Sequence, residues 1–222
     1  MDYFTKTVKL VLVLLTSLTQ ASGFQIGGGL YYISSNVLTN YVVTTGELKT
    51  TEKRHHAITG LGQGIHVGYH YDITNLFSLG AELNLLTTEA EEIEERGVAG
   101  AITRIVDIQM NSAIYPTIHF GVSPTHETTI RLKAGYGSET WSSERTDAPL
   151  DKLSNHSEKG TLLGAEITSQ VSGKVLLGLG IMQSDINHFT VKNDSITNTC
   201  ELCHSPKTTS VSAKIHYQPS GT

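Results

Sequence analysis

Apolar residues occupy every second position in about eight segments of the chain, and polar or small residues fill the positions between them. Side chains on a strand alternate between two faces, so each segment predicts a β-strand with one apolar face. The pattern is clearest in Thr59–Tyr71, Leu76–Thr87, Ile105–Val122, Thr129–Gly137 and Thr161–Val171. Three further strands are predicted at Phe24–Ser34, Lys174–Asn187 and Lys207–Tyr217.

The connections between these strands alternate between short and long. The short ones are tight turns of about 2–5 residues at Asp72–Asn75, Ser123–Glu127 and Ser172–Gly173. The long ones are polar loops of about 15–23 residues at Ser35–Ala57, Glu89–Thr103, Ser142–Glu158 and His188–Pro206. The alternation is typical of a barrel inserted from one side of a membrane. The sequence therefore predicts an all-β fold, an eight-stranded antiparallel up-and-down transmembrane β-barrel with short periplasmic turns and long extracellular loops.

The N-terminal segment has the features of a secretory signal peptide. Lys6 and Lys9 precede the apolar run Leu10–Leu18, which is too short to span a bilayer as a helix. Small residues follow at positions 21–23, where cleavage is expected. The domain organisation predicted is a signal peptide at 1–23 and one barrel over 24–222, exported to the outer membrane of a Gram-negative bacterium.

Charge and composition narrow the classes of function. The net charge is −5 with histidine neutral, and losing Asp2, Lys6 and Lys9, together +1, makes it −6, which disfavours nucleic acid as a partner. The charged fraction of 17% is below the roughly 25% of soluble proteins. No segment reaches the roughly 20 apolar residues of a spanning helix, so only a closed sheet can satisfy backbone groups in lipid.

The apolar faces are predicted to point toward lipid. The polar faces are rich in glycine and sparsely charged, which suits a narrow lumen better than a water-facing wall. On the fourth strand this assigns Ile108, Met110 and Ile114 to the lipid face. Aromatic residues form two expected interfacial belts, with Tyr69, Tyr71, Phe77, Phe120 and Tyr217 near the turns and Tyr32, Tyr136 and Trp141 near the loops. A soluble barrel of lipocalin type, with the apolar face inside, is the alternative.

Charged residues on the polar faces fall at one level of the predicted barrel, roughly 10–18 Å above the short turns. They are Glu82, Lys133, Glu166 and Lys214, with His66 near the same level and Arg131 just below. An unpaired charge in a narrow lumen is costly, so these groups are expected to pair with one another. We interpret the layer as a structural plug, and the alternative is a gate whose pairs exchange to pass ions.

These features together resemble the barrel domain of outer-membrane protein A-type proteins and are similar to the opacity proteins of bacterial surfaces. The resemblance covers residues 24–217 and rests on the strand pattern and the interior charge layer. It implies a monomeric barrel held in outer-membrane lipid and lipopolysaccharide and inserted by the barrel-assembly machinery. It also implies a structural, surface-antigen or adhesion role through loops that contact a host or surface ligand. A narrow porin-like pore is the alternative function.

Cysteine and acidic motifs lie in the predicted outer loops. The segment Cys200–His204 fits the C-x-x-C-H pattern of haem attachment. A disulfide between Cys200 and Cys203 is the simpler interpretation in an exported loop, and haem or a metal site with His188 is the alternative. The acidic run Glu89–Glu95 lacks the spacing of a calcium loop, so a solvated loop without a metal is expected.

Neither a cofactor nor catalysis is predicted. Some lipid A-modifying barrels use a serine nucleophile and a histidine base placed two residues apart on one strand. None of the ten histidines here has a serine two residues later. A small basic patch, Lys53–His56, is expected at the tip of the first loop. The sequence therefore favours a non-enzymatic barrel, with lipid A modification as a less favoured alternative.

Overall fold

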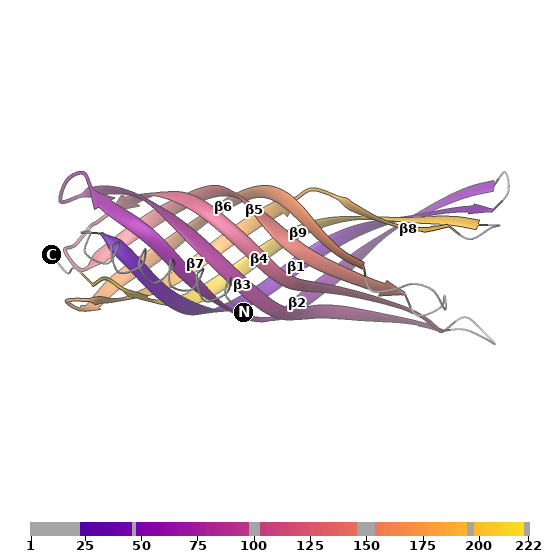
Figure 1. The fold of residues 1–222 in the computed structure, drawn as a ribbon, viewed down its shortest axis with the longest axis horizontal. Coiled ribbons are helices and arrows are strands. Elements are labelled where there is room, and N and C mark those ends of the chain that lie inside the picture. Colours follow the sequence, from indigo (N-terminus) through magenta and orange to yellow (C-terminus); the bar gives the residue numbers. More distant parts are fainter. Residues whose placement is uncertain (1–22, 46–47, 98–102, 146–153, 195–197, 220–222) are drawn as a thin grey trace, which may run out of the picture.

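The computed structural model shows an antiparallel barrel closed on itself (Figure 1). Described residues are 23–45, 48–97, 103–145, 154–194 and 198–219. The predicted signal peptide therefore lies outside the described residues, apart from Gly23. Among the described residues, no helix has the length and hydropathy needed to cross a bilayer.

Nine strands are described, in one sheet. Their bounds are β1 Phe24–Thr45, β2 Leu48–Asp72, β3 Phe77–Gly97, β4 Thr103–Val122, β5 Thr128–Arg145, β6 Ser154–Ser172, β7 Val175–Ile186, β8 Phe189–Asp194 and β9 Asn198–Tyr217. Each strand from β1 to β7 pairs with the next, and β9 pairs with β1 to close the barrel. Strand β8 pairs with the outer part of β9, and β7 pairs with the rest of it. The two strands therefore occupy one position in the wall, and the predicted eight-stranded barrel is confirmed.

The strands continue well beyond the predicted loop boundaries. The sequence predicts loops at Ser35–Ala57 and His188–Pro206, but β1 and β2 pass through the first, and β8 and β9 through the second. The acidic run Glu89–Glu95 likewise belongs to β3. Polar residues continue a hydrogen-bonded ladder outside lipid, so polarity alone does not end a strand. Figure 1 shows the resulting long hairpins projecting from one end of the barrel.

The outer wall is apolar over the part of the barrel next to the short turns. Along β4, Ile114, Pro116, Ile118 and Phe120 are exposed while the residues between them are buried. The exposed fraction of the side chain is 62–72% at Leu30, Leu61, Ile65, Ile118, Leu132, Leu163 and Leu179. Wide exposure of large apolar side chains is the arrangement that lipid requires and water disfavours. The predicted orientation, with apolar faces outward, holds over this region.

A β-bulge reverses the predicted orientation farther along β4. The sequence assigns Ile108 and Met110 to the lipid face, but both are buried inside the barrel. The pairing of β4 with β5 skips one residue between Met110 and Ser112, so Asn111 is the extra residue. One extra residue moves every later side chain to the opposite face. A second irregularity lies between Thr87 and Ala90 of β3.

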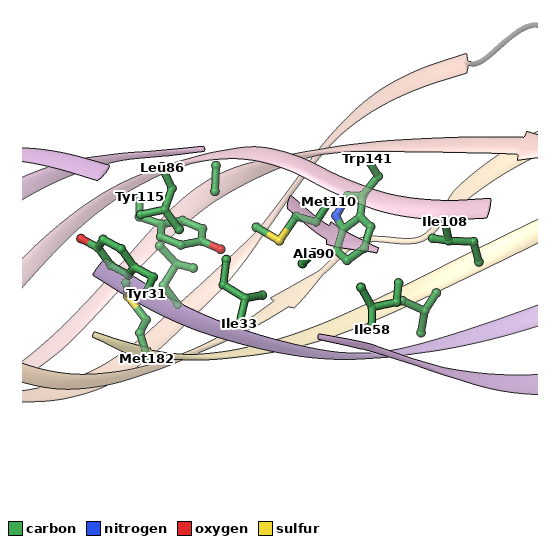
Figure 2. Packing of buried hydrophobic residues seen from close by; sticks show 13 residues of the cluster. Tyr31, Ile33, Ile58, Leu86, Ala90, Ile108, Met110, Tyr115, Trp141 and Met182 are labelled. Atoms are coloured by element: carbon green, nitrogen blue, oxygen red, sulfur yellow. The ribbon is translucent and has the colours of Figure 1, made fainter. Parts of the chain in front are cut away.

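Trp141 also points into the barrel rather than to the outer interfacial belt. Its side chain is fully buried, and it packs in the apolar cluster with Met110 and Ile108 (Figure 2). Trp141 is an even number of residues from Arg131 and Lys133, which also face the lumen. The two-residue period of the strand therefore explains why Trp141 faces the lumen, whereas its aromatic character alone predicts the interfacial belt.

Candidate functional site

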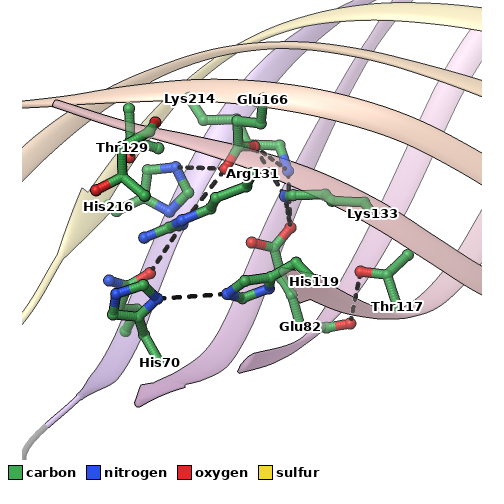
Figure 3. A network of polar contacts seen from close by, with 12 residues as sticks. His70, Glu82, Thr117, His119, Thr129, Arg131, Lys133, Glu166, Lys214 and His216 are labelled. Atoms are coloured by element: carbon green, nitrogen blue, oxygen red, sulfur yellow. Dashed lines mark hydrogen bonds and ion pairs between the residues drawn. The ribbon is translucent and has the colours of Figure 1, made fainter. Parts of the chain in front are cut away.

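The lumen nearest the short turns holds a layer of charged side chains. Five residues, here called the ion layer, come from four different strands: Glu82 of β3, Arg131 and Lys133 of β5, Glu166 of β6 and Lys214 of β9. Each has a relative side-chain exposure of 4% or less. Three cations and two carboxylates give the layer a formal charge of +1. The structure thus brings these predicted residues into one contact network (Figure 3).

Both lysines of the ion layer bridge both glutamates. Lys133 Nζ lies 3.0 Å from Glu82 Oε1 and 2.9 Å from Glu166 Oε2. Lys214 Nζ lies 2.8 Å from Glu82 Oε1 and 3.1 Å from Glu166 Oε2. Arg131 Nη1 is 3.4 Å from Glu166 Oε1. Because the attraction between charges rises as water is excluded, these shared contacts compensate much of the cost of burying the charges.

Neutral residues complete the hydrogen bonding of the ion layer. Lys214 Nζ donates to Asn84 Oδ1 at 2.8 Å, and Arg131 Nη1 donates to Gln25 Oε1 at 3.2 Å. The hydroxyl of Tyr31 donates to the same Asn84 oxygen at 3.4 Å. The sequence analysis missed these partners. Asn84 lies two residues from Glu82, so the two-residue strand period could have placed both side chains on the same lumen face.

His66 lies beside the ion layer and forms none of the ion pairs described. Its ring packs on His216, with centroids 4.4 Å apart, and His216 Nε2 in turn lies 3.7 Å from Glu166 Oε1. His216 was not among the predicted residues, although it shares a strand face with Lys214.

Within the described part of the chain, one group of possible metal ligands combines the two glutamates of the ion layer with His216. Ligand atoms of Glu82, Glu166 and His216 all fall within 4.8 Å of one another. Both carboxylates, however, already contact the ammonium groups of Lys133 and Lys214. The lysines thus supply the positive charge that a metal would bring, and the arrangement favours a plug over a metal centre.

The lumen on the far side of the ion layer is filled by apolar side chains. This apolar plug consists of Tyr31, Ile33, Val37, Ile58, Leu86, Ala90, Ile108, Met110, Ala113, Tyr115, Trp141, Leu162 and Met182 (Figure 2). The sequence analysis assigns the apolar faces to lipid and the polar, glycine-rich faces to the lumen, so the apolar filling of the outer half corrects that prediction. The β4 bulge is one reason, because it turns Ile108 and Met110 inward.

Among the residues that the structure describes, one carboxylate, Glu139, lies within the apolar plug. It accepts hydrogen bonds from Tyr115 Oη at 2.6 Å, Trp141 Nε1 at 3.1 Å, Ser184 Oγ at 2.5 Å and Thr208 Oγ1 at 3.2 Å. Four neutral donors satisfy a buried carboxylate that has no cationic partner among the described residues. The sequence analysis missed Glu139, even though it follows Arg131 and Lys133 at even spacing on the lumen face.

The loop motifs lie on strands of the hairpins. Cys200 and Cys203 are both in β9, where three residues span about 10 Å, whereas bridged cysteines have Cα atoms within about 7 Å. A bond between them would require β9 to leave the strand conformation here, and the disulfide stays a prediction. His204 is buried, with its Nδ1 2.9 Å from Thr39 Oγ1. His56 of the predicted basic patch is also buried rather than at a loop tip.

Comparison with known proteins identifies the architecture. The family profile described as outer membrane protein beta-barrel domain matches residues 9–215. No curated protein gives a significant sequence match. The outer membrane protein OprG of Pseudomonas aeruginosa is similar in structure, with a TM-score of 0.60, 16% identity, and coverage of 89% of this chain and 95% of OprG.

Two other solved structures are more distantly similar. The outer membrane protease OmpT of Escherichia coli gives a TM-score of 0.49 at 7% identity, covering 90% of this chain and 99% of OmpT. The attachment invasion locus protein Ail of Yersinia pestis gives a TM-score of 0.40 at 9% identity, covering 86% of this chain and 99% of Ail. At these identities the likenesses bear on the fold alone.

Proposed function

Because this chain belongs to the outer membrane protein beta-barrel domain family, we propose that it is a non-conducting barrel that acts as a surface scaffold. The barrel anchors the chain in the outer membrane, and the long hairpins contact ligands outside the cell. Structural support of the envelope and adhesion or antigen display are then two uses of one architecture. The proposal includes a monomeric state and contact with lipopolysaccharide around the wall.

The observation that supports a non-conducting barrel is the filling of the lumen at two successive levels. The ion layer occupies one level with side chains that are 4% exposed or less, and the apolar plug occupies the next. Water and ions would have to displace paired charges first and a packed apolar cluster afterwards. An eight-stranded barrel is only wide enough for side chains to fill it, which agrees with both levels.

The length of the hairpins supports a role outside the membrane. Strand β1 has 22 residues and pairs with β2 along its entire length, from Phe24–Tyr69 to Thr45–Leu48. At about 3.3 Å per residue and a tilt near 40°, such a strand rises roughly 55 Å, whereas the apolar band of an outer-membrane barrel is about 25 Å tall. More than half of this hairpin therefore stands clear of lipid.

An attachment assay tests the scaffold role. The full chain is expressed in a non-adherent Gram-negative host, beside a variant in which residues 38–55 are replaced by a two-residue turn closed by the Val37–His56 pair of β1 and β2. We expect the native chain to raise attachment to an epithelial monolayer several-fold above empty vector, and the shortened variant to lose that gain at equal surface amount. Attachment equal to empty vector, with the native chain shown on the surface, would contradict an adhesive role.

A second candidate function is a gated narrow pore, and one observation favours it. Lys133 and Lys214 each contact both Glu82 and Glu166, so the ion layer has alternative pairings of similar geometry. Exchange between pairings is a route by which a gate opens without leaving any charge unpaired. Single-channel conductance separates this function from the scaffold.

We propose no enzymatic activity. The His and Ser spacing that a lipid A-modifying barrel requires is missing from the sequence, and the charged residues of the ion layer and Glu139 are engaged with one another or with neutral donors. A catalytic group needs access to its substrate, whereas these side chains are buried behind the wall.

A further inference from the structure

We propose that His70 and His119 form a transition-metal site at the periplasmic end of the lumen. The two side chains come from β2 and β4 (Figure 3), and His119 lies opposite Gly80, two residues nearer the β2–β3 turn than Glu82. Both are buried, with exposed fractions of 9% and 4%. The sequence analysis did not single out either residue, and the ion layer does not use them.

The spacing of the two imidazoles suits a shared ion. His70 Nδ1 lies 3.4 Å from His119 Nε2, and the rings are stacked with centroids 5.7 Å apart. Two nitrogen ligands on a tetrahedral ion with bonds of 2.0–2.1 Å are about 3.3–3.4 Å apart. Small rotations of the rings therefore direct both nitrogen lone pairs at one ion without moving the strands.

A carboxylate fixes the orientation of one ligand. Asp72 Oδ1 lies 3.0 Å from His70 Nε2, the nitrogen that does not face His119. A carboxylate on the far nitrogen of a ligating histidine sets its tautomer and raises its basicity. This contact leaves Nδ1 of His70 as the acceptor that a metal needs.

Access and charge also suit a cation. His70 and Asp72 line a cavity of about 340 Å³ at the short-turn end, together with Glu127 and His126 of the β4–β5 turn. The cavity lining includes one guanidinium, Arg131, which lies 3.4 Å from Glu166. With the histidines neutral, two carboxylates and one guanidinium give this lining a formal charge of −1, which favours a divalent ion.

The ligand count defines which ions should bind and how tightly. Within the described residues, no third His, Cys, Asp or Glu ligand atom completes a compact set with His70 and His119. Water would fill the other positions, as in open metal sites. Imidazole ligands with open positions favour Cu²⁺ over Ni²⁺ and Zn²⁺. We expect micromolar binding of one Cu²⁺ per barrel.

Calorimetric titration of the full-chain protein from outer membranes with Cu²⁺, Ni²⁺ and Zn²⁺ tests the site. We expect His70→Gln and His119→Gln each to weaken Cu²⁺ binding at least tenfold, and Asp72→Asn to weaken it about tenfold. The matched control is His55→Gln, an exposed histidine on the β1–β2 hairpin, which should leave the affinity unchanged. Heat-modifiable gel mobility confirms that each variant is folded.

Electron paramagnetic resonance of the native protein with one equivalent of Cu²⁺ gives an answer that does not depend on variants. We expect the hyperfine pattern of two imidazole nitrogens, lost when Zn²⁺ competes in excess. No Cu²⁺ binding, a spectrum without nitrogen ligands, or binding that is unchanged in folded His70→Gln and His119→Gln variants would overturn the site. None of these outcomes bears on the surface role of the hairpins, so the two proposals are tested separately.

Discussion

Glycines make room for the ring side chains of the lumen. His119 lies opposite Gly80 on the neighbouring strand, and a Cβ atom placed on Gly80 would collide with His119 Nε2 and with the carbonyl oxygen of Tyr69. His66 lies opposite Gly27 in the same way, with its Cε1 and Nε2 atoms 2.6 Å from a Cβ placed there. The space that a large neighbour needs therefore accounts for glycine at these two positions.

The replacement Gly80→Ala is expected to destabilise the barrel by about 1–3 kcal/mol, because both neighbours would have to move in a packed lumen. Gly173→Ala is the matched control, since a Cβ there meets nothing within 4 Å, and its effect should stay within about 0.5 kcal/mol. Urea unfolding followed by the fluorescence of Trp141 measures both. Equal stabilities of the two variants would contradict this account of Gly80.

At the scale of the strands, the ion layer joins parts of the wall that are not neighbours in the sheet. Lys133 of β5 contacts Glu82 of β3, and Lys214 of β9 reaches the same carboxylate across the lumen. Backbone hydrogen bonds connect only adjacent strands, so these ion pairs connect strands that the sheet itself leaves unconnected. Removing one partner takes close contacts from buried charged groups that water cannot reach.

Lys133→Met should therefore lower the free energy of unfolding by about 3–5 kcal/mol, because both glutamates would lose a lysine contact and Glu82 would keep Lys214 alone. Lys207→Met is the control, since Lys207 and Asp185 form an exposed pair, 63% and 61% accessible, worth at most about 1 kcal/mol. Heat-modifiable gel mobility against temperature compares the two. A loss of stability no larger for Lys133→Met than for Lys207→Met would show that the ion layer does not stabilise the barrel.

On the scale of the whole molecule, the barrel combines an apolar wall with a lumen of two different fillings. The wall faces lipid near the short turns, and the ion layer lies inside that part. The apolar plug follows toward the hairpins, with Glu139 satisfied within it. Two fillings of opposite character in series oppose permeation more strongly than either alone, since ions avoid the apolar part and neutral solutes must disrupt the charged part.

Planar bilayers with the reconstituted native protein should therefore show no resolved single-channel openings, whereas a porin inserted in the same membrane confirms that the recording detects them. A tenfold higher protein amount should not change this result. Reproducible openings that disappear or change amplitude in Lys133→Ala would instead support the gated pore and exclude the non-conducting scaffold.

Much of the molecule follows from short-range rules that the sequence alone determines. Period-two alternation places Ile118 outside and His119 inside, and turn-forming residues mark Asp72–Asn75 as a connection. The same alternation puts Glu82 and Lys133 on lumen faces, and equal distance from the turns puts them at one level. These properties depend on the order of residues along one strand, so they can be predicted from the sequence alone.

Only the tertiary structure decided what depends on pairing between strands. One unpaired residue, Asn111, turns Ile108 and Met110 inward, and no local property of the chain marks that position as a bulge. The hairpins continue as strands because each polar residue finds a backbone partner across the ladder, which hydropathy does not record. The contact of His70 with His119 likewise depends on how β2, β3 and β4 are staggered, so distances across the lumen had to come from the closed barrel.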